Sequence, residues 1–187
     1  MFPFGGVEVM LLGALVAAVV CAVGAVLVRR RTGWSWAISL WLLVWSVVVI
    51  GLVTLIPANG APGIVPVEGR LEECSWDIGG PAPDGFWIFS GGQRLLNAVI
   101  FVPSGALLVM VVARWPRAAI VLAPLGLAAL VGYSVGIEFT QLALARIDRA
   151  CDVTDMIDNA TGAAVGTLLG VPLAFVLRPW KRSTVER

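Results

Sequence analysis

Long apolar runs alternate with abrupt polar breaks along the chain. Apolar residues dominate five segments, at about residues 7–28, 36–56, 95–113, 118–143 and 156–177. An α-helix needs about 20 apolar residues to cross the hydrocarbon core of a bilayer. The pattern therefore predicts five transmembrane helices. The fourth run is the longest, and it is expected to be either one helix or a helix broken near Gly132 or Gly136.

Composition supports a membrane environment for the whole chain. Of the 187 residues, 59% are hydrophobic and 13% are charged, and the mean hydropathy is +0.93. A soluble domain carries about 25% charged residues, so a soluble enzyme and a DNA-binding domain are excluded. The net charge of +1 gives no basis for nucleic-acid binding. We expect an all-α polytopic helix bundle that forms a single integral membrane domain over residues 1–187.

The basic residues are distributed unequally between the two sets of loops. Nine fall beside one set of helix ends and four beside the other; the nine are Arg29, Arg30, Arg31, Arg114, Arg117, Arg178, Lys181, Arg182 and Arg187. Cytoplasmic loops carry the excess of Lys and Arg. The N-terminus is therefore predicted outside and the C-terminus inside, with residues 57–93 as one long extracytoplasmic loop of a multi-pass cell-membrane protein. Tryptophans near the basic breaks are expected to anchor the interface, namely Trp34, Trp36, Trp115 and Trp180.

Polar residues recur at helical spacing near the outer ends of the last three predicted helices. The third segment carries Arg94, Asn97, Phe101 and Ser104, the fourth carries Ser134, Glu138 and Gln141, and the fifth carries Asp152, Asp155, Asn159, Gly162 and Gly166. Spacings of three and four residues place each set on one helix face. Polar groups within membrane spans are costly and mark candidate functional sites. One outward-facing polar pocket is the simplest arrangement that brings the three sets together.

The same residues resemble the signature of VanZ-like membrane proteins. The similar positions are Arg94-x-x-Asn97-x-x-x-Phe101-x-Pro103-x-Gly105, then Glu138-x-x-Gln141, then Arg149-x-x-Asp152-x-x-Asp155-x-x-x-Asn159-x-x-Gly162. This resemblance covers about residues 94–170, and the first two helices and the outer loop are not diagnostic. It implies a small multi-span membrane protein whose founding member is associated with teicoplanin resistance, and it brings no established reaction. Asp158 departs from the pattern and is expected to mark a helix contact outside the pocket.

Eight residues are candidates for ligand binding: Arg94, Asn97, Glu138, Gln141, Arg149, Asp152, Asp155 and Asn159. Glu138 is the candidate acid or base, or else a carboxylate neutralised by Arg94 or Arg149. Asp152 is expected to cap the fifth helix, and Asp152 and Asp155 are only weak metal candidates. The two asparagines are alternatively interhelical hydrogen-bond partners. The series Gly162, Gly166 and Gly170 predicts close helix packing.

Three functional classes remain open. The first is an envelope protein that binds a lipid-linked cell-wall precursor, a lipoglycopeptide or another anionic head group. The second is a membrane enzyme that acts on a lipid head group with carboxylate or divalent-metal chemistry, although no His nucleophile or base is present. The third is a transporter or an accessory structural subunit. No cofactor is expected, and membrane lipids are the expected partners.

The three cysteines differ in their surroundings. Cys21 lies within the first apolar run and is expected to be an unpaired apolar filler. Cys74 and Cys151 both fall in predicted outer segments, where disulfides are permitted. They either remain two free thiols or form a bridge that ties the long loop over the pocket.

Overall fold

The computed structural model describes residues 5–56, 73–78, 92–144 and 151–180. Five helices account for most of these residues: α1 (Val7–Thr32), α2 (Trp34–Leu55), α3 (Gly92–Val112), α4 (Pro116–Leu144) and α5 (Val153–Leu177). The five predicted helices are confirmed, and α4 is continuous through both Gly132 and Gly136. The largest difference at a helix end is in α1, which continues to Thr32 instead of ending at about residue 28. Helix α5 begins at Val153 rather than Met156, because Asp152 caps it.

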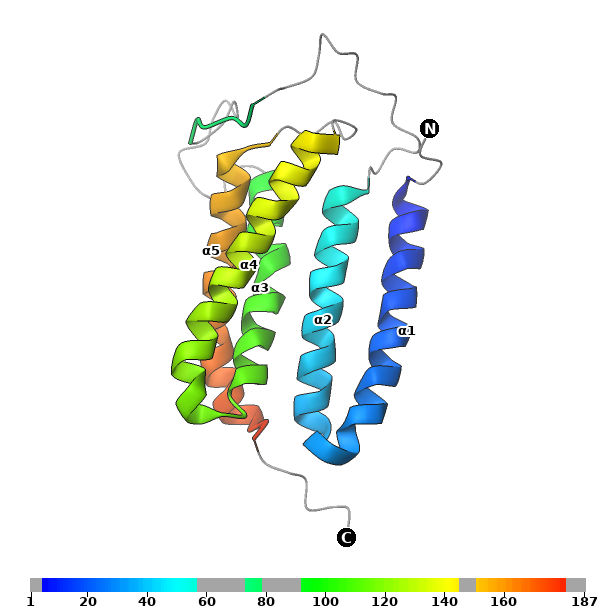
Figure 1. Ribbon diagram of the computed structural model, residues 1–187, viewed down its shortest axis with the longest axis vertical. Helices are drawn as coiled ribbons and strands as arrows, with labels where there is room; N and C mark the ends of the chain where they lie inside the picture. Colours follow the sequence, from blue (N-terminus) through cyan, green and yellow to red (C-terminus); the bar gives the residue numbers. More distant parts are fainter. Residues whose placement is uncertain (1–4, 57–72, 79–91, 145–150, 181–187) are drawn as a thin grey trace.

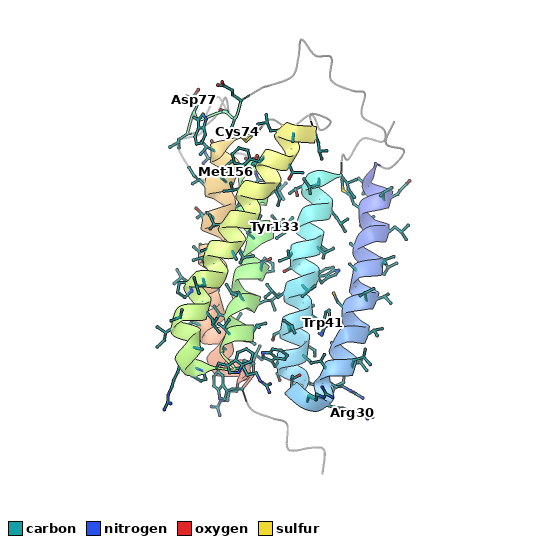
Figure 2. All side chains as sticks on the ribbon, in the orientation of Figure 1. Arg30, Trp41, Cys74, Asp77, Tyr133 and Met156 are labelled. Carbon is teal, nitrogen blue, oxygen red and sulfur yellow. A yellow bond between two sulfur atoms is a disulfide. The ribbon has the colours of Figure 1, made fainter. Side chains whose placement is uncertain are left out.

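The five helices lie side by side with their axes roughly aligned, and successive helices run in opposite directions (Figure 1). Short connections join α1 to α2 at Gly33 and α3 to α4 through residues 113–115. We call the end that holds these connections the arginine end, because Arg29, Arg30, Arg31, Arg114 and Arg117 lie there. The opposite end is the disulfide end, where α5 begins beside Cys151. Figure 2 shows Arg30 at the first end and Cys74 at the second.

Each of the five helices is long and apolar enough to cross a membrane. The helix surfaces agree with that environment, since large aliphatic side chains are exposed along α1 and on the outer faces of α4 and α5. In water such a surface would be costly, whereas in lipid it requires no partner. The chain is therefore a multi-pass membrane protein, with α1 packed mainly against α2 at one edge of the bundle.

Helices α3 and α5 form the closest contact in the bundle. A Cβ atom added at Gly162 would collide with the carbonyl oxygen of Ala98, and one at Gly166 would collide with that of Val102. Gly170 meets Ala106 in the same way. Each pair is 64 residues apart, so the parallel helices keep one register over three successive contacts. The predicted role of the glycines in close packing is confirmed.

Helices α2, α3 and α4 meet in a buried core at mid-height. Phe101 and Ile50 are fully buried there, and the ring of Phe101 lies 6.4 Å from that of Tyr133. The Tyr133 hydroxyl donates a hydrogen bond to the Val47 carbonyl oxygen (2.9 Å). The hydroxyls of Ser46 and Ser104 are 2.9 Å apart and share another hydrogen bond between α2 and α3. These three hydroxyl groups therefore form hydrogen bonds between helices, which replace the water that is absent from a membrane interior.

The arginine end is stabilised by aromatic and cationic side chains. Arg114 donates to the carbonyl oxygen of Thr32 (2.6 Å) and lies over the ring of Trp36. Trp36 donates through Nε1 to the Val111 carbonyl oxygen (2.9 Å) and packs edge-on against Trp115. Trp36 is thus buried between helices, so its expected role as an interface anchor is wrong. Its indole N–H is used to satisfy a helix C-terminal carbonyl group instead of reaching the interface.

Candidate functional site

A disulfide joins residues 73–78, which lie between α2 and α3 in the sequence, to the residue before the N-cap of α5. Cys74 and Cys151 are bonded, with their Cα atoms 4.6 Å apart. Ser75 donates to the Cys151 carbonyl oxygen (2.8 Å) and accepts from the N–H of Val153 (3.0 Å). Of the two alternatives left open by the sequence, the structure has the bridge. Cys21 is buried and unpaired, as expected.

Asp152 is the N-cap of α5. Its Oδ1 accepts the N–H of Thr154 at 2.8 Å, and the Thr154 hydroxyl donates to the carbonyl oxygen of Asp77. The predicted cap is therefore present, and it uses one of the carboxylate oxygens that a metal would need. Among the residues that the structure describes, no three His, Cys, Asp or Glu side chains are placed to share a metal ion.

Glu138 reaches from α4 to the N-terminus of α5. Its side chain is 2% exposed, and its Oε2 accepts the backbone N–H of Asp152 at 3.2 Å. The first N–H groups of a helix are unpaired within it and carry a partial positive charge, so a carboxylate is favoured there. Glu138 therefore faces the interior of the bundle and joins α4 to the start of α5.

Arg94 forms an ion pair with Asp158. Its Nε and Nη2 donate to the two carboxylate oxygens at 2.9 and 3.2 Å, and the Asp158 side chain is fully buried. This pairing corrects the expectation that Arg94 serves Glu138; the other arginine suggested for Glu138, Arg149, lies outside the described residues. Asp158 does mark a helix contact, as expected, but it also carries the counter-charge of a predicted site residue.

Two amide side chains connect α4 to its neighbours. Asn159 donates to the Ser134 hydroxyl (2.9 Å), one turn along α4 from Glu138. Gln141 donates to the carbonyl oxygen of Thr54 (2.9 Å), near the end of α2. Both amides are buried, so these contacts bring three helices, α2, α4 and α5, together at the disulfide end.

Asn97 differs from the other polar residues of this end. It lies one turn after Arg94 on α3, and its Nδ2 is buried with no hydrogen-bond partner among the described residues. A buried N–H donor without a partner costs about 1–3 kcal/mol. An unsatisfied donor beside a satisfied polar network is the arrangement expected where a ligand supplies the missing acceptor.

Most of the predicted site residues thus lie at one end of the bundle. The polar contacts of Arg94, Glu138, Gln141, Asp152 and Asn159 link α2, α3, α4 and α5, and Asp155 lies in the first turn of α5. Sequence reasoning missed Ser75 and Thr54, which contribute backbone groups that no side-chain pattern marks. It underrated Asp158, although the spacing of four residues before Gly162 places it on the glycine face.

The fold and these contacts define a polytopic membrane protein with a polar cluster at one end. The family model for VanZ/LLP1 matches residues 9–176. The chain therefore belongs to the VanZ/LLP1 family, and the match includes the first two helices, which carry none of the motif residues of the resemblance. A search of curated proteins and a search of solved structures each found no match.

Proposed function

We propose that the protein binds the head group of a lipid-linked molecule at the disulfide end, on the outer face of the cell membrane. The observation that carries this proposal is the buried Nδ2 of Asn97, which has no partner in the described part of the chain. Asn97 is partly exposed as a residue although Nδ2 itself is covered, so a ligand acceptor would reach this nitrogen after a rotation of the side chain. The placement outside rests on the excess of basic residues at the other end.

The charges near Asn97 restrict the chemistry of the head group. At the disulfide end, the described residues of α3, α4, α5 and the α5 cap supply one guanidinium, Arg94, and four carboxylates, Glu138, Asp152, Asp155 and Asp158. Arg94 is paired with Asp158 through Nε and Nη2, so Nη1 is the guanidinium nitrogen that these two hydrogen bonds do not use. A simple anion fits such a site less well than a head group that offers both acceptors and donors. A phosphate that carries sugar or peptide groups, as in a lipid-linked wall precursor, has both.

A contribution to teicoplanin resistance would follow from this binding. A protein that holds a wall precursor or the lipoglycopeptide itself at the membrane surface changes how the drug meets its target. The enzyme alternative lacks a supporting observation among the described residues, since Asp152 caps a helix and Glu138 accepts a backbone N–H. Binding is therefore the function that the site supports best.

The test is the retention of lipid by purified protein. Wild type and the Asn97→Leu and Glu138→Gln variants would be purified in mild detergent and analysed by lipid mass spectrometry, and then titrated with a polyprenyl phosphate. We expect a bound prenyl-linked lipid in wild type and its loss in both variants. Thr140→Val is the matched control, because Thr140 is exposed on α4 one turn from Gly136 and should not alter retention. Equal retention by all four proteins would contradict the proposal.

A further inference from the structure

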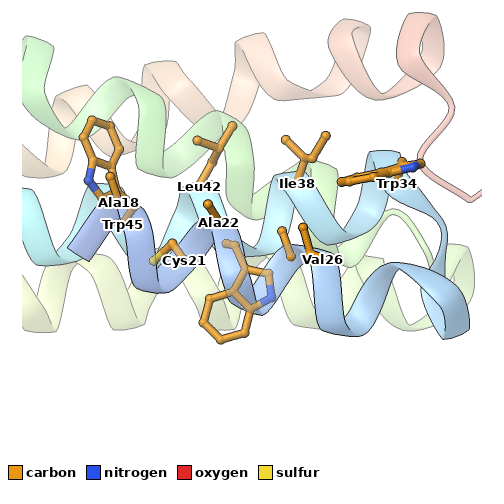
Figure 3. A pocket seen from close by; sticks show the side chains of 10 residues that line it. Ala18, Cys21, Ala22, Val26, Trp34, Ile38, Leu42 and Trp45 are labelled. Carbon is orange, nitrogen blue, oxygen red and sulfur yellow. The ribbon is translucent and has the colours of Figure 1, made fainter. Parts of the chain in front are cut away.

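An apolar groove of about 410 Å³ runs between α1 and α2 (Figure 3). Its walls are aliphatic and aromatic side chains, among them Ala18, Ala22, Trp34, Trp41 and Trp45. Small residues on α1 make the space, since Ala18, Ala22 and Ala25 stand where larger side chains would close the helix contact. The groove is separate from the polar cluster, which lies at the disulfide end of α2–α5.

A cation lies beside one end of the groove, stacked on a tryptophan that lines it. Trp34 lines it at the arginine end, and the Arg29 guanidinium carbon lies 4.5 Å from the centre of the Trp34 ring. Arg29 Nε is buried and has no hydrogen-bond partner among the described residues. Arg30 and Arg31 follow directly and are exposed. An arginine with an unused donor beside an apolar groove is suited to a phosphate whose chains enter the groove.

A second buried donor without a partner among the described residues belongs to a side chain that lines the groove at greater depth. Trp41 packs its ring against Gly24, and its Nε1 is buried with no partner in the described part of the chain. The neighbouring Trp45 differs, since its Nε1 donates to the Ala14 carbonyl oxygen (2.9 Å). Gly24 is five residues from Arg29, a rise of about 7.5 Å at 1.5 Å per residue. The ester carbonyl groups of a glycerophospholipid lie one glycerol unit below its phosphate, which matches two donors stacked at different depths.

The length of the groove also matches one leaflet. From Arg29 to Ala18 the rise along α1 is about 17 Å, which is close to half of a hydrocarbon core of about 30 Å. We propose that this groove binds one anionic glycerophospholipid, with its phosphate at Arg29, an ester carbonyl at Trp41 and an acyl chain along Ala22 and Ala18. A helix of a second copy of the chain could also fill the groove, but it would not offer one acceptor to Arg29 and another to Trp41.

The experiment is native mass spectrometry of the purified protein with defined lipids. The probes are phosphatidylglycerol, phosphatidylcholine and an ether-linked phosphatidylglycerol that lacks the ester carbonyls. We expect wild type to retain one ester phosphatidylglycerol about tenfold more strongly than phosphatidylcholine, and about threefold or more above the ether analogue. Arg29→Gln should remove the head-group preference, while Arg31→Gln, an exposed neighbour, should keep it.

Two further variants separate the groove from the fold. Trp41→Phe keeps the ring but removes the donor, so it should erase the ester-over-ether preference alone. Ala22→Trp should fill the groove and abolish retention, while Val23→Trp, whose exposed position is outside the groove, should leave it intact. Equal retention of all lipids by wild type would overturn the proposal. A dimer that Ala22→Trp converts to a monomer would overturn it as well, by assigning the groove to a second copy.

Discussion

Arg94 and Asp158 continue the register of the glycine contact between α3 and α5. They are 64 residues apart, as are Ala98 and Gly162 one turn further along. The ion pair is therefore the outermost of four equivalent contacts. It is also the only one of the four that depends on charge, and the other three depend on the absence of side chains.

Loss of Arg94 alone should be worse than loss of the pair. Arg94→Leu leaves a fully buried carboxylate without its cation, which is expected to lower the free energy of unfolding by about 3–5 kcal/mol. Arg94→Leu combined with Asp158→Leu removes both charges and should be closer to wild type. Unfolding in mixed micelles measures both, with the exposed Arg117→Leu as control. A double variant that is less stable than either single variant would refute the pairing.

Alanine at the glycines of α5 should separate the helices. Gly162→Ala or Gly166→Ala places a Cβ on a backbone carbonyl oxygen of α3, which cannot move aside, and should cost about 1–3 kcal/mol or more. Gly132→Ala and Gly136→Ala are matched controls on α4, where a Cβ would meet no atom within 4 Å. Those two should be neutral or slightly stabilising, because alanine favours helix. Thermal unfolding of the four purified variants gives the comparison.

Asn97 and Asn159 should respond in opposite directions to the same substitution. Asn97→Leu removes an unsatisfied donor and should leave the unfolding temperature unchanged or higher. Asn159→Leu breaks the hydrogen bond to Ser134 and should lower stability by about 1–3 kcal/mol. Both would be measured without added lipid. A large loss of stability in Asn97→Leu would mean that its amide serves the fold rather than a ligand.

The disulfide should make stability sensitive to reductant. The bond closes a loop of 77 residues, for which the chain-entropy model gives about 4 kcal/mol. Reduction should lower the unfolding temperature of wild type and leave Cys74→Ser, already lower, unaffected. Mass spectrometry after alkylation in denaturant without reductant should find one modified cysteine, Cys21. Three modified cysteines would show that the bridge does not form in the cell.

The orientation can be tested by labelling with an impermeant maleimide. In a background without the three native cysteines, Asp77→Cys at the disulfide end should be modified in intact cells. Arg117→Cys at the arginine end should react only after the membrane is opened. These outcomes follow from the excess of basic residues at the arginine end, which predicts that this end is cytoplasmic. The reverse pattern would move the proposed head-group site to the cytoplasmic face.

The helices were predictable because lipid imposes a simple rule on sequence. Each span must be apolar over its whole length, so the five runs mark α1–α5 to within a few residues. The glycine contact followed from spacing alone. Trp36 was misassigned because position near an arginine-rich break does not reveal which way a side chain points. Its burial depends on Val111 at the end of α3 and on Trp115 in the connection between α3 and α4, which the sequence near Trp36 does not indicate.

The sequence predicted which residues belong to the polar cluster better than it predicted which of them form pairs. Helical periodicity gathers Arg94, Glu138 and Asn159 at one depth, but several carboxylates there could neutralise one arginine. The choice of Asp158 is decided by the α3–α5 register, which only the three-dimensional packing fixes. Likewise the acceptor for Gln141 is the backbone carbonyl oxygen of Thr54, and a pattern of side-chain types cannot indicate which backbone group is used.

The constant register of α3 on α5 has a mechanical consequence. At the three inner contacts, carbonyl oxygens and backbone atoms of α3 occupy the space that a Cβ would take on the glycines of α5, so the two helices are closely interlocked. A slide of either helix would drive side chains into backbone and separate Arg94 from Asp158 at the same moment. The pair therefore moves as one rigid strut. If the polar cluster opens to admit a head group, the movement must come from α4 or from the α1–α2 pair. Movement of α4 away from α5 would break the Glu138–Asp152 and Asn159–Ser134 contacts, and movement of α2 away from α4 would break the Gln141–Thr54 hydrogen bond.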